Sequence, residues 1–159
     1  CIRDSAYRAL IDVRDRGDLV SAGVANFYEE TLDEIIDATG TAPAVNQVEL
    51  HTGFTQPELR EYHAKHSILT EAWAPLGRGE ILNDPAITEI AEAHDATPGQ
   101  IALAHLLAHG ISVIPKTANP ERLAENYGAL SVALSDDEVA RLDRVQGHRQ
   151  SKDPRQFPG

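Results

Sequence analysis

Short apolar runs alternate with segments of helical periodicity along the chain. Four runs, at residues 20–25, 44–50, 68–73 and 111–114, predict β-strands. Between the strands, apolar residues recur at helical spacing, as Leu32, Ile35 and Ile36 do within residues 30–38. The same pattern predicts helices over residues 5–16, 57–66 and 85–94, and helices that begin near residues 98, 120 and 136. Strands that alternate with helices form parallel sheets covered by helices, so the pattern predicts an α/β fold.

Local signals mark the ends of several of these helices. Gly40 follows residues 30–38 at the place of a C-cap glycine. Thr97 and Asn119 are each followed by a proline, which is typical of an N-cap and a first helical residue. Ser135 and Glu138 have the spacing of a capping box, so the last helix is expected to begin just after Ser135.

Composition and charge exclude several classes of protein. The 25 Asp and Glu outnumber the 14 Lys and Arg, and the resulting formal charge of −11 argues against a non-specific nucleic-acid binder or a basic membrane-surface module. No run approaches the ~20 apolar residues of a membrane span. A single cysteine, Cys1, excludes an intrachain disulfide and fits a reducing compartment, so we expect a cytoplasmic protein. The absence of Met in a chain that opens on Cys1 suggests a piece of a longer protein.

Polar and aromatic residues follow the predicted strands. Asn26, Gln47, Trp73 and Lys116 stand at or near the carboxyl ends of four strands, where parallel sheets bind ligands. Two amides, an indole face and an ammonium group suit a ligand with an aromatic amide at one end and a phosphate at the other. A nicotinamide dinucleotide fits that description.

The chain resembles the aldo-keto reductases, a family of (β/α)8 barrels that bind NADPH in an extended pose. Five blocks match the family in order and spacing: residues 23–27, 46–51, 72–77, 114–117 and 119–126. A complete barrel takes ~250 residues. The resemblance therefore implies that residues 1–159 are a partial aldo-keto reductase domain, the C-terminal half of a (β/α)8 TIM barrel with about four parallel strands and surrounding helices.

The resemblance also implies which residues contact the nicotinamide end of the cofactor. Residues at the positions of Asn26 and Gln47 hold the carboxamide in family members, and the aromatic residue at the position of Trp73 stacks on the ring. The segment with Leu76 and Gly77 runs along the pyrophosphate, where a missing side chain lets the backbone come close.

At the other end of the cofactor, Lys116, Thr117 and Arg122 match the positions that grip the 2′-phosphate, and Glu125 and Asn126 match the adenine contacts. Elementary chemistry agrees with this assignment, because a guanidinium in the first turn of a helix makes a ready phosphate site. We therefore expect NADPH as the cofactor, in preference to NADH.

Two departures from the family weaken the expected hold on the cofactor. Ala25 and Ala74 stand where family members usually have serine, so two hydroxyl contacts are lost. Each lost hydrogen bond costs on the order of 1 kcal/mol of binding. Thr52 replaces a usual proline, which is expected to alter only a loop.

The family's catalytic Asp, Tyr, Lys and His lie on its first four strands, by the resemblance, and this chain matches the part that follows them. Tyr7, Tyr28, Tyr62 and Tyr127 are all expected on or beside helices, so we assign no catalytic residue. The parent enzyme is expected to reduce small aldehydes or ketones to alcohols, with this chain as its cofactor-binding half. The alternative is a non-catalytic NADPH-binding or assembly fragment that self-associates through open sheet edges.

Simpler structural roles are available for the same residues. Trp73 can serve as a core residue, Lys116 and Arg122 as solvated surface cations, and Asn26 and Gln47 as hydrogen-bonding partners of the backbone. These roles can coexist with cofactor binding.

Histidine pairs and the end of the chain carry two further expectations. His105 and His109 share a helix face, as do His63 and His66, but the sequence places no third ligand, so no metal site is expected. Residues 148–159 are expected to form a loose C-terminal extension.

Overall fold

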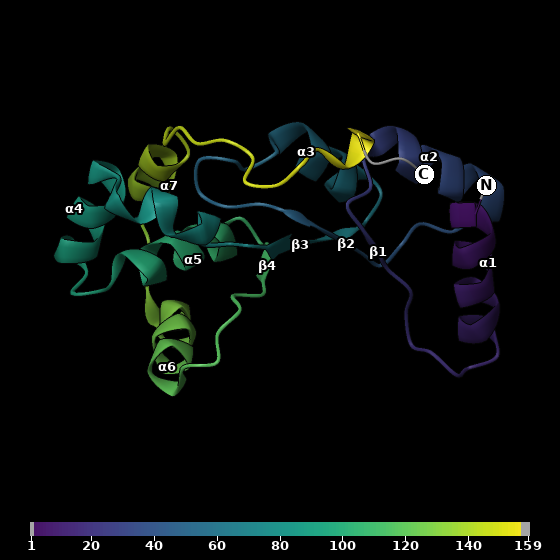
Figure 1. The fold of residues 1–159 in the computed structure, drawn as a ribbon, viewed down its shortest axis with the longest axis horizontal. Coiled ribbons are helices and arrows are strands. Elements are labelled where there is room, and N and C mark those ends of the chain that lie inside the picture. Colours follow the sequence, from purple (N-terminus) through teal and green to yellow (C-terminus); the bar gives the residue numbers. More distant parts are fainter. Residues whose placement is uncertain (1, 157–159) are drawn as a thin grey trace. The chain divides into compact units, whose positions relative to one another are not determined.

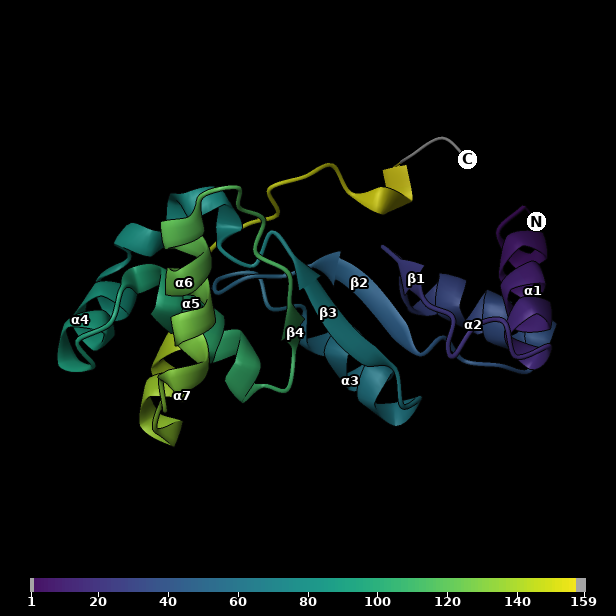
Figure 2. The same ribbon diagram turned by 90° about the horizontal axis from the view of Figure 1, so that it is seen from below.

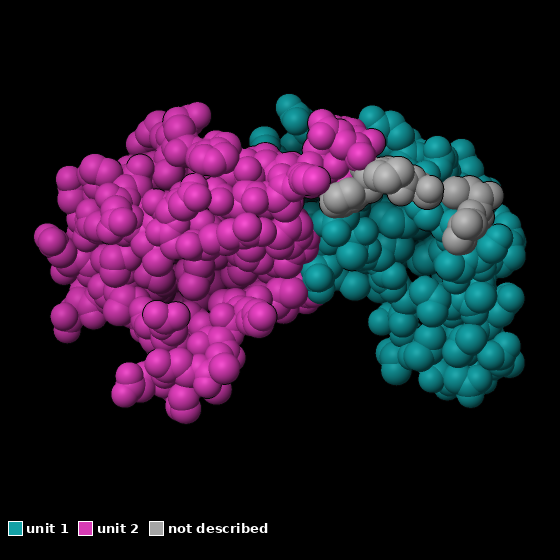
Figure 3. Space-filling view, viewed as in Figure 1, with its two compact units in different colours: residues 1–48, 56–70 teal, residues 49–55, 71–159 magenta. Residues whose placement is uncertain are grey.

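The computed structural model describes residues 2–156 and divides the chain into two compact units (Figures 1 and 3). Unit 1 comprises Cys1–Val48 and Gln56–Thr70, and unit 2 comprises Glu49–Thr55 and Glu71–Gly159. Cys1 and residues 157–159 of the expected extension lie outside the described residues.

Unit 1 is built from α1 (Ile2–Asp15), β1 (Val24–Ala25), α2 (Glu29–Thr39), most of β2 (Val45–Glu49) and α3 (Pro57–Lys65). β1 and β2 are parallel, with Val24 opposite Asn46. Helices α1 and α2 pack together, and the fully buried side chains include Leu32 and Ile35, as the helical spacing predicts. Gly40 ends α2 with φ of 68°, and its N–H donates to the carbonyl of Ile36, which confirms the predicted C-cap.

Unit 2 contains the last three residues of β3 (Leu69–Trp73). It also contains α4 (Pro85–Ala93), α5 (Pro98–Ala108), β4 (Ser112–Val113), α6 (Pro120–Gly128) and α7 (Asp136–Leu142). β3 and β4 are parallel, with Glu71 opposite Ser112. The four strands follow the order β1-β2-β3-β4, which confirms the predicted α/β class with four parallel strands and surrounding helices.

Helix α5 is the centre of unit 2. It contacts α4, α6 and α7 (Figures 1 and 2), and most of its side chains are buried. A helix that is apolar all round is expected to be enclosed by neighbours, as α5 is. Its predicted N-cap, Thr97, forms a full capping box with Gln100, and Ser135 forms the predicted box with Glu138.

The strands are shorter than the apolar runs predicted. β1 has two residues in place of 20–25, and β4 has two in place of 111–114. Val20 is fully exposed, because apolar composition alone does not supply the neighbouring strand that a ladder requires. Among residues 2–156, the sequence pattern also does not predict the 3-10 segments η1 (Gly77–Asn83), which is interrupted by non-helical angles at Arg78 and Gly79, η2 (Ala129–Ser131) and η3 (Pro154–Gln156).

Candidate functional site

Unit 2 contains a cavity of about 620 Å³. Its lining comes from three segments: residues 74–82 after β3, Gly99 at the start of α5, and residues 115–126 after β4. β3 ends at Trp73 and β4 at Val113, so the cavity lies just beyond the carboxyl ends of both strands. This is where parallel α/β sheets place their ligands.

Most of the charged side chains that line the cavity are cations. Arg78, Lys116 and Arg122 all contribute to it, against the single carboxylate of Glu125. Arg122 stands in the first turn of α6, whose N-cap residue Asn119 accepts hydrogen bonds through Oδ1 from two first-turn N–H groups. The combination of two guanidinium groups, an ammonium group and a helix N-terminus favours an anionic ligand such as a phosphate.

The loop after β3 has an unusual backbone. Ala74, Gly77, Arg78 and Gly79 all have left-handed φ angles, of 50°, 54°, 53° and 93°. A left-handed residue other than glycine costs roughly 1–2 kcal/mol, and such residues cluster at ligand-binding loops. The backbone of this loop therefore marks the cavity as a candidate site independently of its charges.

The packing inside this loop disfavours a side chain at Gly77. A Cβ atom there would lie 3.1 Å from Cγ1 of Ile81 and 3.2 Å from Nδ1 of His51. The space that its missing side chain leaves is therefore taken up by protein atoms. The expected approach of a pyrophosphate to Gly77 stays a prediction.

Glu125 is held in place from another helix. The Thr97 hydroxyl donates to Oε1 of Glu125 at 2.6 Å, and Thr97 is also the N-cap of α5. The carboxylate therefore lies at the positive end of α5, where the helix dipole favours a negative charge. This contact ties α6, and with it Arg122, to the buried centre of unit 2.

Asn26 and Gln47 lie in unit 1. Asn26 directly follows β1 with φ of 59°, and its N–H donates to the Gln47 carbonyl at 2.9 Å. The two predicted nicotinamide-binding residues are thus neighbours along the β1–β2 pair.

A buried chain of hydrogen bonds in unit 1 supports the backbone beside Asn26. The Asn46 amide donates to the Phe27 carbonyl at 2.7 Å and to Nε2 of His63 at 3.0 Å. Nδ1 of His63 in turn meets Oγ1 of Thr70 at 2.8 Å. Burial lowers the pKa of His63 to about 4, so the ring is neutral at pH 7. This role of His63 is not predictable from the sequence, where the one signal is a histidine on the inward face of a helix.

A family model for the aldo/keto reductases matches residues 3–146. The chain belongs to the aldo/keto reductase family. It is 45% identical over 152 residues to an aldo-keto reductase of Mycolicibacterium smegmatis, covering 95% of this chain and 55% of the relative. It is 42% identical to the 2,5-diketo-D-gluconic acid reductase B of a Corynebacterium species, covering 90% and 52%. The chain thus spans about half the length of the curated relatives it matches.

Solved structures of the same family share this fold. The apo form of Gox0644 has a TM-score of 0.93 at 43% identity, and a Gox0644 mutant in complex with NADPH has a TM-score of 0.92 at 42% identity. Each comparison covers 96% of this chain and 57% of the other. The resemblance stated from the sequence is confirmed.

The cavity gathers most of the residues that the aldo-keto reductase resemblance singled out. Six of the ten line it: Leu76, Lys116, Thr117, Arg122, Glu125 and Asn126. Gly77 lies between two lining residues, and Trp73 immediately precedes a third. Their individual roles stay predictions.

The tyrosines lie where the sequence predicted them, on or beside helices. Tyr7 is in α1, Tyr28 is the N-cap residue of α2, Tyr62 is in α3 and Tyr127 is in α6. The Tyr62 hydroxyl donates to Oδ1 of Asp33 at 2.6 Å. Burial and this hydrogen bond raise the pKa of Tyr62.

A buried carboxylate holds part of the C-terminal segment. Glu49, at the end of β2, accepts hydrogen bonds from the backbone of Gln150, from the backbone N–H of Ser151 at 3.1 Å and from the Ser151 hydroxyl. Nη1 of Arg149 lies 3.6 Å from the same carboxylate. The expectation of a loose extension over residues 148–159 stays a prediction, with Glu49 as an anchor near its start.

Glu49→Gln is expected to release this segment, because an amide loses the negative charge and one of the two acceptor oxygens. Trypsin should then cut after Arg149 and Lys152 several-fold faster than in the unchanged chain, as measured by the intact mass of the products over time. Glu80→Gln is the matched control, since Glu80 meets this segment through two side chains, Gln150 at 2.8 Å and His148 at 3.8 Å, whereas Glu49 also accepts hydrogen bonds from its backbone. Equal cleavage rates in the two variants would contradict the anchoring role of Glu49.

Proposed function

We propose that this chain takes part in the NADPH-dependent reduction of aldehydes or ketones to alcohols, as the half that binds the cofactor. The observation that carries the proposal is the cavity beyond β3 and β4, with Lys116 and Arg122 in its lining. The names of two relatives support the reaction type: the 2,5-diketo-D-gluconic acid reductase B, and the methylglyoxal reductase DkgA of Escherichia coli, which is 38% identical.

The residues of the cavity fit the phosphate end of NADPH. Arg122 can bind a phosphate through two parallel N–H groups, and Lys116 adds a point charge. A 2′-phosphate distinguishes NADPH from NADH, so these cations favour NADPH. Glu125 and Asn126 offer the acceptor and donor groups that the edge of an adenine needs. The cavity volume falls within the usual range of ligand sites, roughly 300–1,000 Å³.

Trp73, at the end of β3, is proposed to stack on the nicotinamide ring and to fix which of its faces meets the substrate. Within unit 1, Asn26 and Gln47 keep the proposed role of binding the carboxamide. When bound, the cofactor supplies the hydride that reduces the carbonyl carbon. The protein's part in this proposal is to bind and orient the cofactor.

We propose no catalytic residue in this chain. The four tyrosines lie on or beside helices, and the hydrogen bond from Tyr62 to Asp33 favours its protonated form. These placements support the proposal that none of the four tyrosines donates the proton in the reduction. We also propose that the chain self-associates through the edges of β1 and β4, the first and last strands in the sheet order β1-β2-β3-β4.

Arg122→Ala is expected to weaken NADPH binding about 10- to 100-fold, the usual effect of losing a hydrogen bond between charged groups, and to leave NADH binding nearly unchanged. The reporter is the emission of Trp73, the chain's single tryptophan, during titration with each nucleotide. Arg144→Ala removes an exposed arginine of unit 2 that is not among the cavity residues, and serves as the control.

Two results would contradict the proposal. Equal losses of affinity for NADPH and NADH in Arg122→Ala would mean that Arg122 does not bind the 2′-phosphate. A folded chain whose Trp73 emission shows no saturable response to NADPH would not be a cofactor-binding half.

A further inference from the structure

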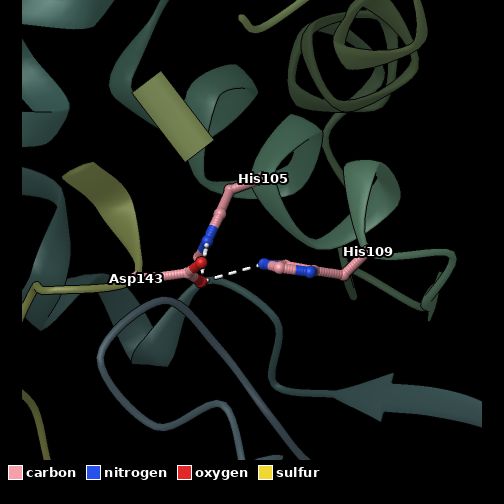
Figure 4. Close-up of side chains that lie close together, drawn as sticks. All are labelled: His105, His109 and Asp143. Carbon is pink, nitrogen blue, oxygen red and sulfur yellow. Dashed lines mark hydrogen bonds and ion pairs between the residues drawn. The ribbon is translucent and has the colours of Figure 1, made fainter. Parts of the chain in front are cut away.

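Two helices of unit 2 bring three metal-ligating side chains together (Figure 4). Nε2 of His105 and Nε2 of His109 each lie 2.9 Å from the same atom, Oδ1 of Asp143. One ligand atom from each of the three residues lies within 4.8 Å of the others. We propose that His105, His109 and Asp143 form a binding site for a divalent transition metal, with Zn²⁺ as the best fit.

The geometry of the cluster suits zinc. His105 lies in α5 and His109, four residues later, is its C-cap residue, so the two rings project from one side of the helix end, and Asp143 is the C-cap residue of α7. Tetrahedral zinc, with bonds of about 2.0–2.1 Å, places its ligand atoms about 3.3 Å apart. The two 2.9 Å separations therefore need to open by only a few tenths of an ångström. Imidazole with one carboxylate selects zinc, cobalt or nickel over magnesium or calcium.

A second residue prepares His105 for this role. Nδ1 of His105 lies 2.9 Å from the hydroxyl of Thr52, and both residues are fully buried. When that hydroxyl accepts the Nδ1 proton, Nε2 keeps a free lone pair for the metal. Without an ion, Nε2 of each histidine carries the proton that it donates to Asp143, so metal binding moves the proton of a neutral ring to Nδ1 and releases one proton to solvent only from a protonated ring. Buried partners of this kind hold a metal-binding ring in its orientation.

The site is open on one side. His105 is buried, but the side chains of His109 and Asp143 are 23% and 39% exposed, so an ion can enter from the surface. Three protein ligands leave the fourth position of a tetrahedron for water or a small ligand. The bound ion would cross-link α5 to the end of α7.

Two other histidines, His63 in unit 1 and His94 in unit 2, have different partners. Both ring nitrogens of His63 face Asn46 and Thr70, so neither is available to a metal. His94 pairs with Glu138 at 2.7 Å. Among residues 2–156, the cluster at Asp143 is the one group in which three His, Cys, Asp or Glu side chains come close enough to hold a metal ion.

The test is titration of the metal-free full chain with Zn²⁺ in a calorimeter, repeated with Co²⁺ while its visible absorption is recorded. We expect one ion per chain with a dissociation constant in the micromolar range or below. His109→Gln should weaken binding about 10- to 100-fold or more. His94→Gln removes a histidine that also pairs with a carboxylate, and should leave the affinity unchanged.

Circular dichroism shows whether each variant folds, and Asp143→Asn replaces His109→Gln if that variant does not. Asp143→Asn should weaken zinc binding to a similar degree, since an amide oxygen is a poor zinc ligand. Binding no tighter than millimolar in the unchanged chain would overturn the proposal. Equal zinc affinities in the unchanged chain, His109→Gln and Asp143→Asn would also overturn it.

Discussion

Lowering the pH from about 7 to about 4 is expected to destabilise unit 1 by about 3 kcal/mol through His63 alone. Burial lowers the pKa of His63 from 6.5 to about 4. The unfolded chain therefore binds a proton that the folded chain excludes, and stability is lost as the pH falls from about 6.5 towards 4. Well above pH 6.5 the ring is neutral in both states and the penalty is absent.

The hydrogen bonds of His63 explain why its ring stays neutral. The amide nitrogen of Asn46 donates to Nε2, so that nitrogen must keep its lone pair, and Nδ1 is left to donate to the Thr70 hydroxyl. If Nε2 were protonated, its N–H would face the N–H of the Asn46 amide in a buried place, with two donors and no acceptor. Because Asn46 also holds the backbone of Phe27, acid should loosen the segment that carries Asn26.

The measurement is urea unfolding at a series of pH values, followed by far-UV circular dichroism. His63→Gln removes the titrating group, so its stability should depend less on pH between 7 and 4, whatever its stability at pH 7. His66→Gln, which removes the next histidine in the same segment, is the control. A His63→Gln curve parallel to that of the unchanged chain would show that His63 does not carry this acid sensitivity.

The helices could be predicted well because their signals are local. Thr97 with Pro98, and Ser135 with Glu138, define helix starts within four residues of sequence, and both are caps in the structure. Strand bounds depend on distant partners. Val20 lies in an apolar run and is nevertheless fully exposed, because the pairing of β1 with β2 involves only Val24 and Ala25.

The candidate sites likewise combine residues that are close in the sequence with residues that only folding brings together. Lys116 and Arg122 lie six positions apart in one segment after β4, and the sequence could place them together. The contacts His105–Asp143 and Thr52–His105 join residues 38 and 53 positions apart. The sequence supplied the histidine pair, but only folding brings the third ligand and the buried hydroxyl to it. The same holds for Asn46 and His63, 17 positions apart.

Ile101→Ala is expected to lower the free energy of unfolding of unit 2 by about 2–5 kcal/mol, the largest single-residue effect we predict. Ile101 is fully buried in α5 and belongs to one cluster with Ile87, Ile90 and Leu142 from α4 and α7. Removing its side-chain carbons costs their burial and also leaves a cavity, which the surrounding helices can fill only in part.

The effect is expected to reach the cofactor cavity. α5 begins at Pro98, its residue Gly99 lines the cavity, and its N-cap Thr97 holds Glu125. Urea unfolding followed by Trp73 emission reports on unit 2, where Trp73 lies. Ile101→Val keeps most of the buried volume and should cost about 0.5–1.5 kcal/mol. A loss in Ile101→Ala no larger than that of Ile101→Val would mean that α5 is not the packed centre of unit 2.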